Sequence, residues 1–136
     1  VHVWKNNGAE GEVVKVLKAH AAPVRACSFS RDGNKLATAS LDKSVKVWEI
    51  SSWRQLNEFA HVGKVFDVHF TADSSRVLSA SAFATCTLWD AAAQGPDKAP
   101  LREFKTGSGS CFSCALIGDD KYVAMASEHG TVYFWD

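Results

Sequence analysis

An internal repeat constrains the fold of this chain more than any other feature. Residues 19–50, AHAAPVRACSFSRDGNKLATASLDKSVKVWEI, are short apolar runs separated by turn residues. Runs of four to seven residues rich in Val, Thr, Ser and Trp, bounded by Asp and Gly, predict antiparallel strands. The segment recurs after 41 positions and, more weakly, after 87. The matching residues are His61, Val65, Phe70, Asp73, Val77, Ser81 and Trp89 in the second copy and Asp119, Val123, Ser127, Val132 and Trp135 in the third.

The composition excludes several classes of function. Fifteen basic and fifteen acidic residues give a net charge of zero, and no Lys/Arg cluster is present, which argues against a surface that follows a nucleic-acid backbone. No apolar run approaches the ~20 residues of a membrane span. The four cysteines fall on predicted strands, which favours reduced thiols and hence a cytoplasmic or nuclear location.

A period of 41 to 46 residues with a Trp closing the third strand of each copy resembles the WD40 repeat, the blade of a β-propeller. The resemblance implies an all-β fold of four-stranded antiparallel sheets. It divides the chain into the end of one blade (1–18), a first blade (19–60), a second blade (61–107) and a third blade that lacks its outer strand (108–136). Propellers close with about four to eight blades, so we expect an incomplete ring whose remaining blades come from the rest of a longer chain or from another copy.

Thirteen strands are expected, grouped as two, four, four and three. The longest insertion, AAAQGPDKAP at 91–100, accounts for the rise of the period from 41 to 46.

A Ser, a His and an acid in the first blade have the composition of a hydrolase triad. However, Ser40 does not lie in a Gly-x-Ser-x-Gly elbow, and Asp42 lies in the tight turn that follows it. The family resemblance implies a structural role instead, in which His20, Ser40, Asp42 and Trp48 form a buried hydrogen-bonded chain. Thr38, on the same side of its strand, is the alternative hydroxyl. We expect no catalytic residue.

The second and third blades depart from this pattern. Phe83 and His129 replace the Asp, and Gly107 replaces the His of the third blade, whereas His61 is retained in the second. Ser81 and Ser127 are the expected hydroxyls. Two explanations stay open: neutral drift, or specialisation of these blades for contact with a partner.

Two further motifs suggest ligands but are expected to bind none. Cys111 and Cys114 have a C-x-x-C spacing, but residues three apart on a regular strand point to opposite faces, which predicts a buried thiol and no metal site. The Gly-rich stretch at 106–110 lacks the Lys and the helix of a phosphate loop, so no cofactor is expected.

WD40-like propellers generally bind partners, often across one face, which we call the top face. The resemblance places eight candidate residues there: Arg25, Leu41, Lys64, Phe66, Phe83, Phe112, Glu128 and His129. Exposed aromatic residues beside Arg and Lys are typical of interaction hot spots, although Phe66 and Phe112 could instead line the channel or pack between blades.

The sequence therefore predicts a platform that binds peptide segments or partner domains and has no catalysis of its own. The alternatives are a regulatory or sensor module of a larger protein, such as a signalling ATPase or a ubiquitin-ligase receptor, and an enzyme with its site at the channel mouth. The mostly apolar residues at the matching positions disfavour the enzyme.

Overall fold

The fold was analysed in a computed structural model, which describes residues 1–6, 8, 11–93, 95 and 98–136. Three residues of the predicted insertion (94, 96 and 97) lie outside the described ones. The described residues form thirteen strands, and none of them lies in a helix, as the all-β prediction required. The strands are β1 (His2–Asn6), β2 (Gly11–Val16), β3 (Val24–Phe29), β4 (Lys35–Ser40), β5 (Ser44–Glu49), β6 (Gln55–Ala60), β7 (Val65–Phe70), β8 (Arg76–Ser81), β9 (Thr85–Asp90), β10 (Arg102–Lys105), β11 (Cys111–Ile117), β12 (Tyr122–Ser127) and β13 (Val132–Trp135).

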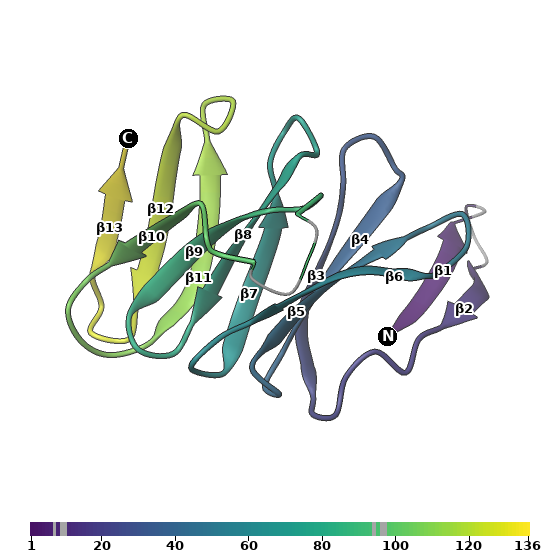
Figure 1. The fold of residues 1–136 in the computed structure, drawn as a ribbon, viewed down its shortest axis with the longest axis horizontal. Helices are drawn as coiled ribbons and strands as arrows, with labels where there is room; N and C mark the ends of the chain where they lie inside the picture. The colour runs from purple at the N-terminus through teal and green to yellow at the C-terminus, as the bar shows by residue number, and fades with distance from the viewer. Residues whose placement is uncertain (7, 9–10, 94, 96–97) are drawn as a thin grey trace.

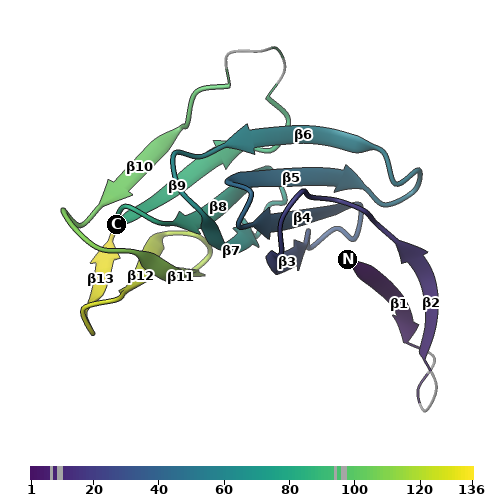
Figure 2. The same cartoon turned by 90° about the horizontal axis from the view of Figure 1, so that it is seen from below.

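The strands form four antiparallel sheets in which chain neighbours pair: β1-β2, β3-β4-β5-β6, β7-β8-β9-β10 and β11-β12-β13. This is the predicted grouping of two, four, four and three. The sheets stand next to one another along the long axis, with β1–β2 at one end and β11–β13 at the other (Figure 1). Viewed from below, they form an open arc and no closed ring (Figure 2). The described part of the chain contains no helix of the length and apolar character that crossing a bilayer requires.

A β-bulge interrupts the first strand of each repeat at the same place. The register shifts between Val24 and Ala26 in β3, between Val65 and Asp67 in β7, and between Cys111 and Ser113 in β11. A bulge leaves one residue unpaired and re-aims the side chains around it. The skipped residues are Arg25, Phe66 and Phe112.

Each sheet buries an apolar face against the next one. Strands β4, β5 and β6 of the first blade pack against β7, β8 and β9 of the second through one core cluster, and the second blade packs against β11 and β12 through another. The face that the first blade contributes consists of Ala37, Ala39, Val45, Val47 and Phe59. Its counterpart in the second blade consists of Leu78, Ala80, Cys86, Leu88 and Phe104.

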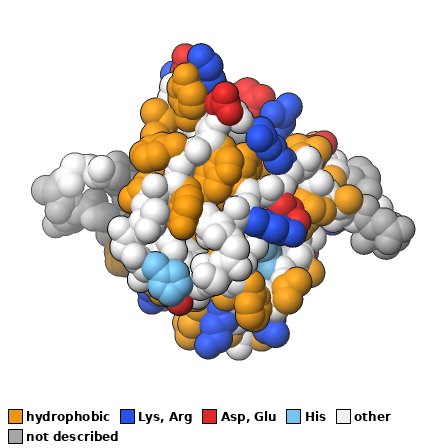
Figure 3. Space-filling view, turned by 90° about the vertical axis from the view of Figure 1, so that its left-hand side faces the viewer, with side chains coloured by type: hydrophobic (Ala, Val, Ile, Leu, Met, Phe, Trp, Pro, Cys, Tyr) orange, Lys and Arg blue, Asp and Glu red, His pale blue; other side chains and the backbone are white. Residues whose placement is uncertain are grey.

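The matching face of the third blade is open. Ala124 and Ala126 on β12 and Val132 and Phe134 on β13 occupy the positions of the buried face of the first blade, but Val132 is 54% exposed and Phe134 is 66% exposed. Seen from the side of β13, apolar side chains gather over this sheet (Figure 3).

Candidate functional site

In the first blade, four polar side chains form a continuous hydrogen-bonded chain. Trp48 Nε1 donates to Thr38 Oγ1 at 3.1 Å, and Thr38 Oγ1 lies 2.8 Å from His20 Nε2. The other ring nitrogen of His20, Nδ1, lies 2.9 Å from Asp42 Oδ2. The expectation that Ser40 supplies the hydroxyl is wrong, because Thr38 is the residue in contact with both rings.

Ser40 forms hydrogen bonds with the backbone at the same end of the blade. Its hydroxyl donates to the carbonyl oxygens of Ala22 and Pro23 at 3.1 and 3.0 Å, and it accepts the N–H of Asp42 at 3.1 Å. It therefore fixes the backbone of the turn that carries Asp42. Thr38, two positions earlier, is opposite Lys46 in the β4–β5 pair, and its side chain reaches the indole of Trp48.

The electrostatics of Asp42 and His20 follow from this environment. Burial alone would raise the pKa of Asp42, but hydrogen bonds from Ser44, the Ala21 N–H and His20 outweigh burial and lower it to about 2. Burial lowers the pKa of His20, and the Asp42 carboxylate opposes part of that shift. At neutral pH a neutral imidazole thus donates to a carboxylate that has four hydrogen-bond donors around it.

The second blade repeats half of this chain. Trp89 Nε1 donates to Ser79 Oγ at 3.0 Å, and Ser79 Oγ lies 3.1 Å from His61 Nε2. The expected hydroxyl, Ser81, instead donates to backbone oxygens of its own turn. Burial lowers the pKa of His61 to about 4, and no described residue forms a hydrogen bond with its Nδ1. His61 lacks the carboxylate that His20 has.

In the third blade the chain is absent from the described residues. Met125, fully buried, stands where Thr38 stands in the first blade, and Gly107 stands where His20 does. Trp135 packs against Phe104 and Tyr133 instead, with ring centroids 5.6 and 5.9 Å apart. Trp135 therefore makes aromatic contacts within its own blade, with Tyr133, and with the second blade, through Phe104 on β10, in place of the hydrogen-bonded chain.

The residues predicted for the top face are brought together, blade by blade, by one repeated backbone hydrogen bond. The bond runs from the turn between the second and third strands to the residue before the first strand. It joins the Leu41 N–H to the Pro23 carbonyl (3.1 Å), Ala82 to Lys64 (2.9 Å) and Glu128 to Ser110 (3.1 Å).

The aromatic residues of the top face come from two blades. The rings of Phe66 and Phe112, the bulge residues of the second and third blades, meet edge to face with their centroids 5.2 Å apart. Phe112 is 50% exposed and Phe83 is 67% exposed. Phe66 and Phe112 therefore pack against each other across two blades while Phe112 keeps half of its surface in solvent.

The top-face candidates of the third blade also include Glu128 and His129. Glu128 Oε2 accepts the Ser110 N–H at 2.9 Å, and Glu128 Oε1 lies 3.8 Å from His129 Nε2. This carboxylate closes the loop before β11 onto the turn of its own blade.

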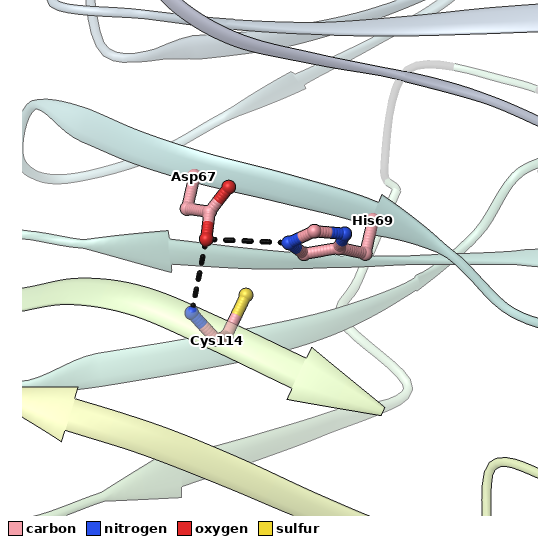
Figure 4. Close-up of side chains that lie close together, drawn as sticks. All are labelled: Asp67, His69 and Cys114. Carbon is pink, nitrogen blue, oxygen red and sulfur yellow. Dashed lines mark hydrogen bonds and ion pairs between the residues drawn. The ribbon is translucent and has the colours of Figure 1, made fainter. Parts of the chain in front are cut away.

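Asp67, which the sequence analysis did not single out, ties the second blade to the third. Its Oδ2 accepts the N–H of Cys114 at 3.1 Å and the hydroxyl of Ser113 at 2.8 Å, and lies 3.3 Å from His69 Nε2 (Figure 4). Burial alone would raise the pKa of Asp67, but these three bonds lower it, and the bond to Asp67 raises the pKa of His69.

Asp67, His69 and Cys114 are also the described group whose ligand atoms lie close enough together to surround a metal ion, all within 4.8 Å of one another. The shared carboxylate oxygen already accepts three hydrogen bonds in this arrangement. The group is therefore best described as a clamp between blades.

The expectation that Cys111 and Cys114 point to opposite faces is wrong. The bulge between Cys111 and Ser113 inserts one residue, so both cysteines face the core between the second and third blades, where both are buried. Cys111 Sγ lies 3.0 Å from Cys86 Sγ across the blade boundary. Sulfur contacts with Cys111 and Cys114, together with burial, raise the pKa of Cys86, which keeps it a neutral thiol. Only the prediction of buried thiols was correct.

Antiparallel four-stranded sheets that stack face to face in an arc, with one Trp in the third strand of each repeat, define the class of protein as a β-propeller segment. The family model described as "WD domain, G-beta repeat" matches residues 11–49 and 98–136. The chain belongs to the WD40-repeat family.

Three curated proteins show what this chain is similar to. "Serine-threonine kinase receptor-associated protein" of Gallus gallus is 28% identical over 129 residues, which is 95% of this chain and 36% of that protein. "Transcriptional corepressor LEUNIG_HOMOLOG" of Arabidopsis thaliana is 34% identical over 98 residues, 70% of this chain and 12% of that protein. "Eukaryotic translation initiation factor 3 subunit I" of Xenopus tropicalis is 34% identical over 76 residues, 55% of this chain and 23% of that protein. The chain spans about a third or less of the length of these relatives.

Proposed function

We propose that this chain is part of a platform that binds peptide segments or partner domains through its top face and carries out no catalysis. WD40-repeat proteins generally act as scaffolds for protein interactions. One observation carries the proposal for this chain. In each repeat the turn between the second and third strands is hydrogen-bonded to the residue two positions before the bulge residue, so the turn and the bulge lie at the same end of every blade.

The chemistry of that face suits a protein partner. Its exposed aromatic rings, Phe83 and Phe112, offer apolar area at little cost in side-chain entropy. Two cationic side chains are also exposed, Arg25 on the first blade and Lys64 on the second. The zero net charge of the chain supports a protein partner over a nucleic acid.

The open face of β12 and β13 supports a second kind of contact. Because Ala124, Ala126, Val132 and Phe134 repeat the face that the first blade buries, another blade of the same kind, from a longer chain or a second copy, is the partner that fits this surface. Burial of two large side chains that are more than half exposed would stabilise such a contact by roughly 1–2 kcal/mol each.

The relatives favour a regulatory setting for the platform. Two of them are named as a kinase receptor-associated protein and a transcriptional corepressor. We therefore place this chain in a regulatory module of a longer protein in the cytoplasm or nucleus. The names do not favour a signalling ATPase or a ubiquitin-ligase receptor in particular.

The test is affinity capture with quantitative mass spectrometry, using the full chain and two matched variants. Phe112→Ala removes a half-exposed ring from the top face, and Phe29→Ala removes a similarly exposed ring from the far end of β3. Partners of the top face should fall about tenfold in recovery with Phe112→Ala and stay unchanged with Phe29→Ala. Equal recovery with both variants would refute the assignment of the binding face.

A further inference from the structure

The second blade has a pocket at the place where the first blade holds a carboxylate. The cavity has a volume of about 340 Å³. Four residues form hydrogen bonds with Asp42 in the first blade, namely His20, Ala21, Ser40 and Ser44. Their counterparts 41 positions later, His61, Val62, Ser81 and Thr85, all line this cavity, together with Phe83, which is the counterpart of Asp42 itself. We call this cavity the second-blade pocket.

The turn above the pocket explains why its own side chain does not fill it. In the turn between β4 and β5 of the first blade, positive φ occurs at Lys43, directly after Asp42. In the corresponding turn of the second blade, Phe83 and Ala84 both have positive φ, 66° and 55°. The backbone of the two turns therefore differs, and Phe83 is 67% exposed. Its ring lies against Gly63, where an added Cβ would stand 2.9 Å from Phe83 Cδ2.

The donors that hold a carboxylate in the first blade have counterparts in the pocket. Asp42 accepts from His20 Nδ1, the Ala21 N–H and Ser44 Oγ. In the second blade, His61 Nδ1 has no hydrogen-bond partner among the described residues, and the Thr85 hydroxyl bonds the carbonyl of its own turn, Phe83 O, at 2.9 Å.

The charges around the pocket also match the first blade, which holds its carboxylate beside an ion pair. Lys46 Nζ lies 3.7 Å from Glu58 Oε2 next to His20, and Lys105 Nζ lies 2.6 Å from Glu103 Oε2 at the rim of the pocket. In both blades a Lys ammonium group neutralises the Glu carboxylate. Because Lys105 offsets the charge of Glu103, repulsion by Glu103 does not prevent a second carboxylate from binding in the pocket.

We infer that the second blade binds an acidic side chain, Asp or Glu, of a partner protein in this pocket, with its carboxylate at the position that Asp42 holds in the first blade. The carboxylate accepts the Nδ1–H of His61 and completes the chain from Trp89 through Ser79. Apolar neighbours of the acidic residue pack on Val62, 85% exposed, and on Phe83. The inference rests on the proposed function as a protein-binding platform, and it adds the chemistry of one contact.

The probe is a pair of peptides that differ by one charge, acetyl-Leu-Asp-Leu-amide and acetyl-Leu-Asn-Leu-amide, titrated into the full chain with ¹⁵N-labelled histidine. The Asp peptide should bind about tenfold tighter than the Asn peptide, because a charged acceptor forms the stronger hydrogen bond. Its binding should shift the His61 Nδ1 signal. His20, whose carboxylate is already in place, is the internal control and should not respond.

Two variants make the result specific. His61→Gln removes the ring donor and should weaken binding of the Asp peptide about tenfold. Thr85→Val keeps the shape of the side chain but removes the hydroxyl donor, so it should also weaken binding of the Asp peptide, which provides a second test if His61→Gln does not fold. Equal affinity for the two peptides, or unchanged affinity in a folded variant, would overturn the inference. If partner capture depends on Phe112 but the Asp peptide does not bind, the proposed function stands and this pocket is rejected. If the Asp peptide binds but partner capture does not depend on Phe112, the pocket stands and the role of Phe112 in partner binding is rejected.

Discussion

Acid should destabilise this protein through His61, and His61→Gln should remove that part of the pH dependence. Burial lowers the pKa of His61 from 6.5 to about 4. The unfolded chain therefore binds a proton near pH 6.5 that the folded chain binds only near pH 4. Stability from the neutral imidazole is complete above pH 6.5 and is lost as the pH falls through this window. The slope is about 1.4 kcal/mol per pH unit, and the total is at most about 3 kcal/mol.

The assay is urea unfolding of the full chain and of His61→Gln at half-unit steps from pH 7.5 to 4. The comparison uses the difference in slope between the two proteins, because the variant also changes packing at every pH. The imidazole ¹⁵N shifts of His61 give its titration directly. Two results would refute the reasoning: a His61 pKa near 6.5, or a slope of unfolding free energy against pH that is the same in His61→Gln and in the parent. Either would show that burial does not lower the pKa of His61.

Two other substitutions test the polar ties within and between blades. Thr38→Val keeps the shape of the side chain but leaves Trp48 Nε1 without its acceptor, so the free energy of unfolding should fall by about 1–3 kcal/mol, measured by urea denaturation; an unchanged value would show that the hydroxyl is dispensable. Asp67→Asn keeps an acceptor but removes its charge, so unfolding should become about 1–2 kcal/mol easier, and the raised pKa of His69 should return toward its usual value in a histidine NMR titration. An unchanged free energy of unfolding would contradict the clamp between blades, and a His69 titration that does not move would contradict the bond between Asp67 and His69 within β7.

The fold was predictable because its signal repeats. Turn residues, short β-branched runs and a Trp recur at a fixed period, so that each copy supports the interpretation of the others. The number and grouping of the strands followed from this period. The hydroxyl of the polar chain did not, because Thr38 and Ser40 lie on the same side of β4 and both are buried. The two hydroxyls are distinguished only by the register of β4 against β5, because this register places Thr38, and not Ser40, within reach of the indole of Trp48.

The orientation of the cysteines was not predictable from a regular strand. Alternation places residues three apart on opposite faces, but a single bulge beside Cys111 restores the same face at Cys114. The chain contained a clue, since Cys27 and Val68 align with Cys114 and follow bulges of their own. The role of Asp67 had no comparable signal, because it depends on contacts between residues 46 and 47 positions apart.

The packing of Trp89 gives the second blade a built-in optical reporter. The indole stacks on Phe59 of the first blade, with centroids 5.0 Å apart, and meets the ring of His61 edge to face at 5.2 Å. A protonated imidazole quenches indole emission by accepting an electron from the excited ring, whereas a neutral imidazole does so much less. The chain has five tryptophans, so the part of its emission that comes from Trp89 is the difference between the parent and a Trp89→Phe variant. That difference reports whether His61 is charged, and on a stopped-flow instrument it would time events in the pocket.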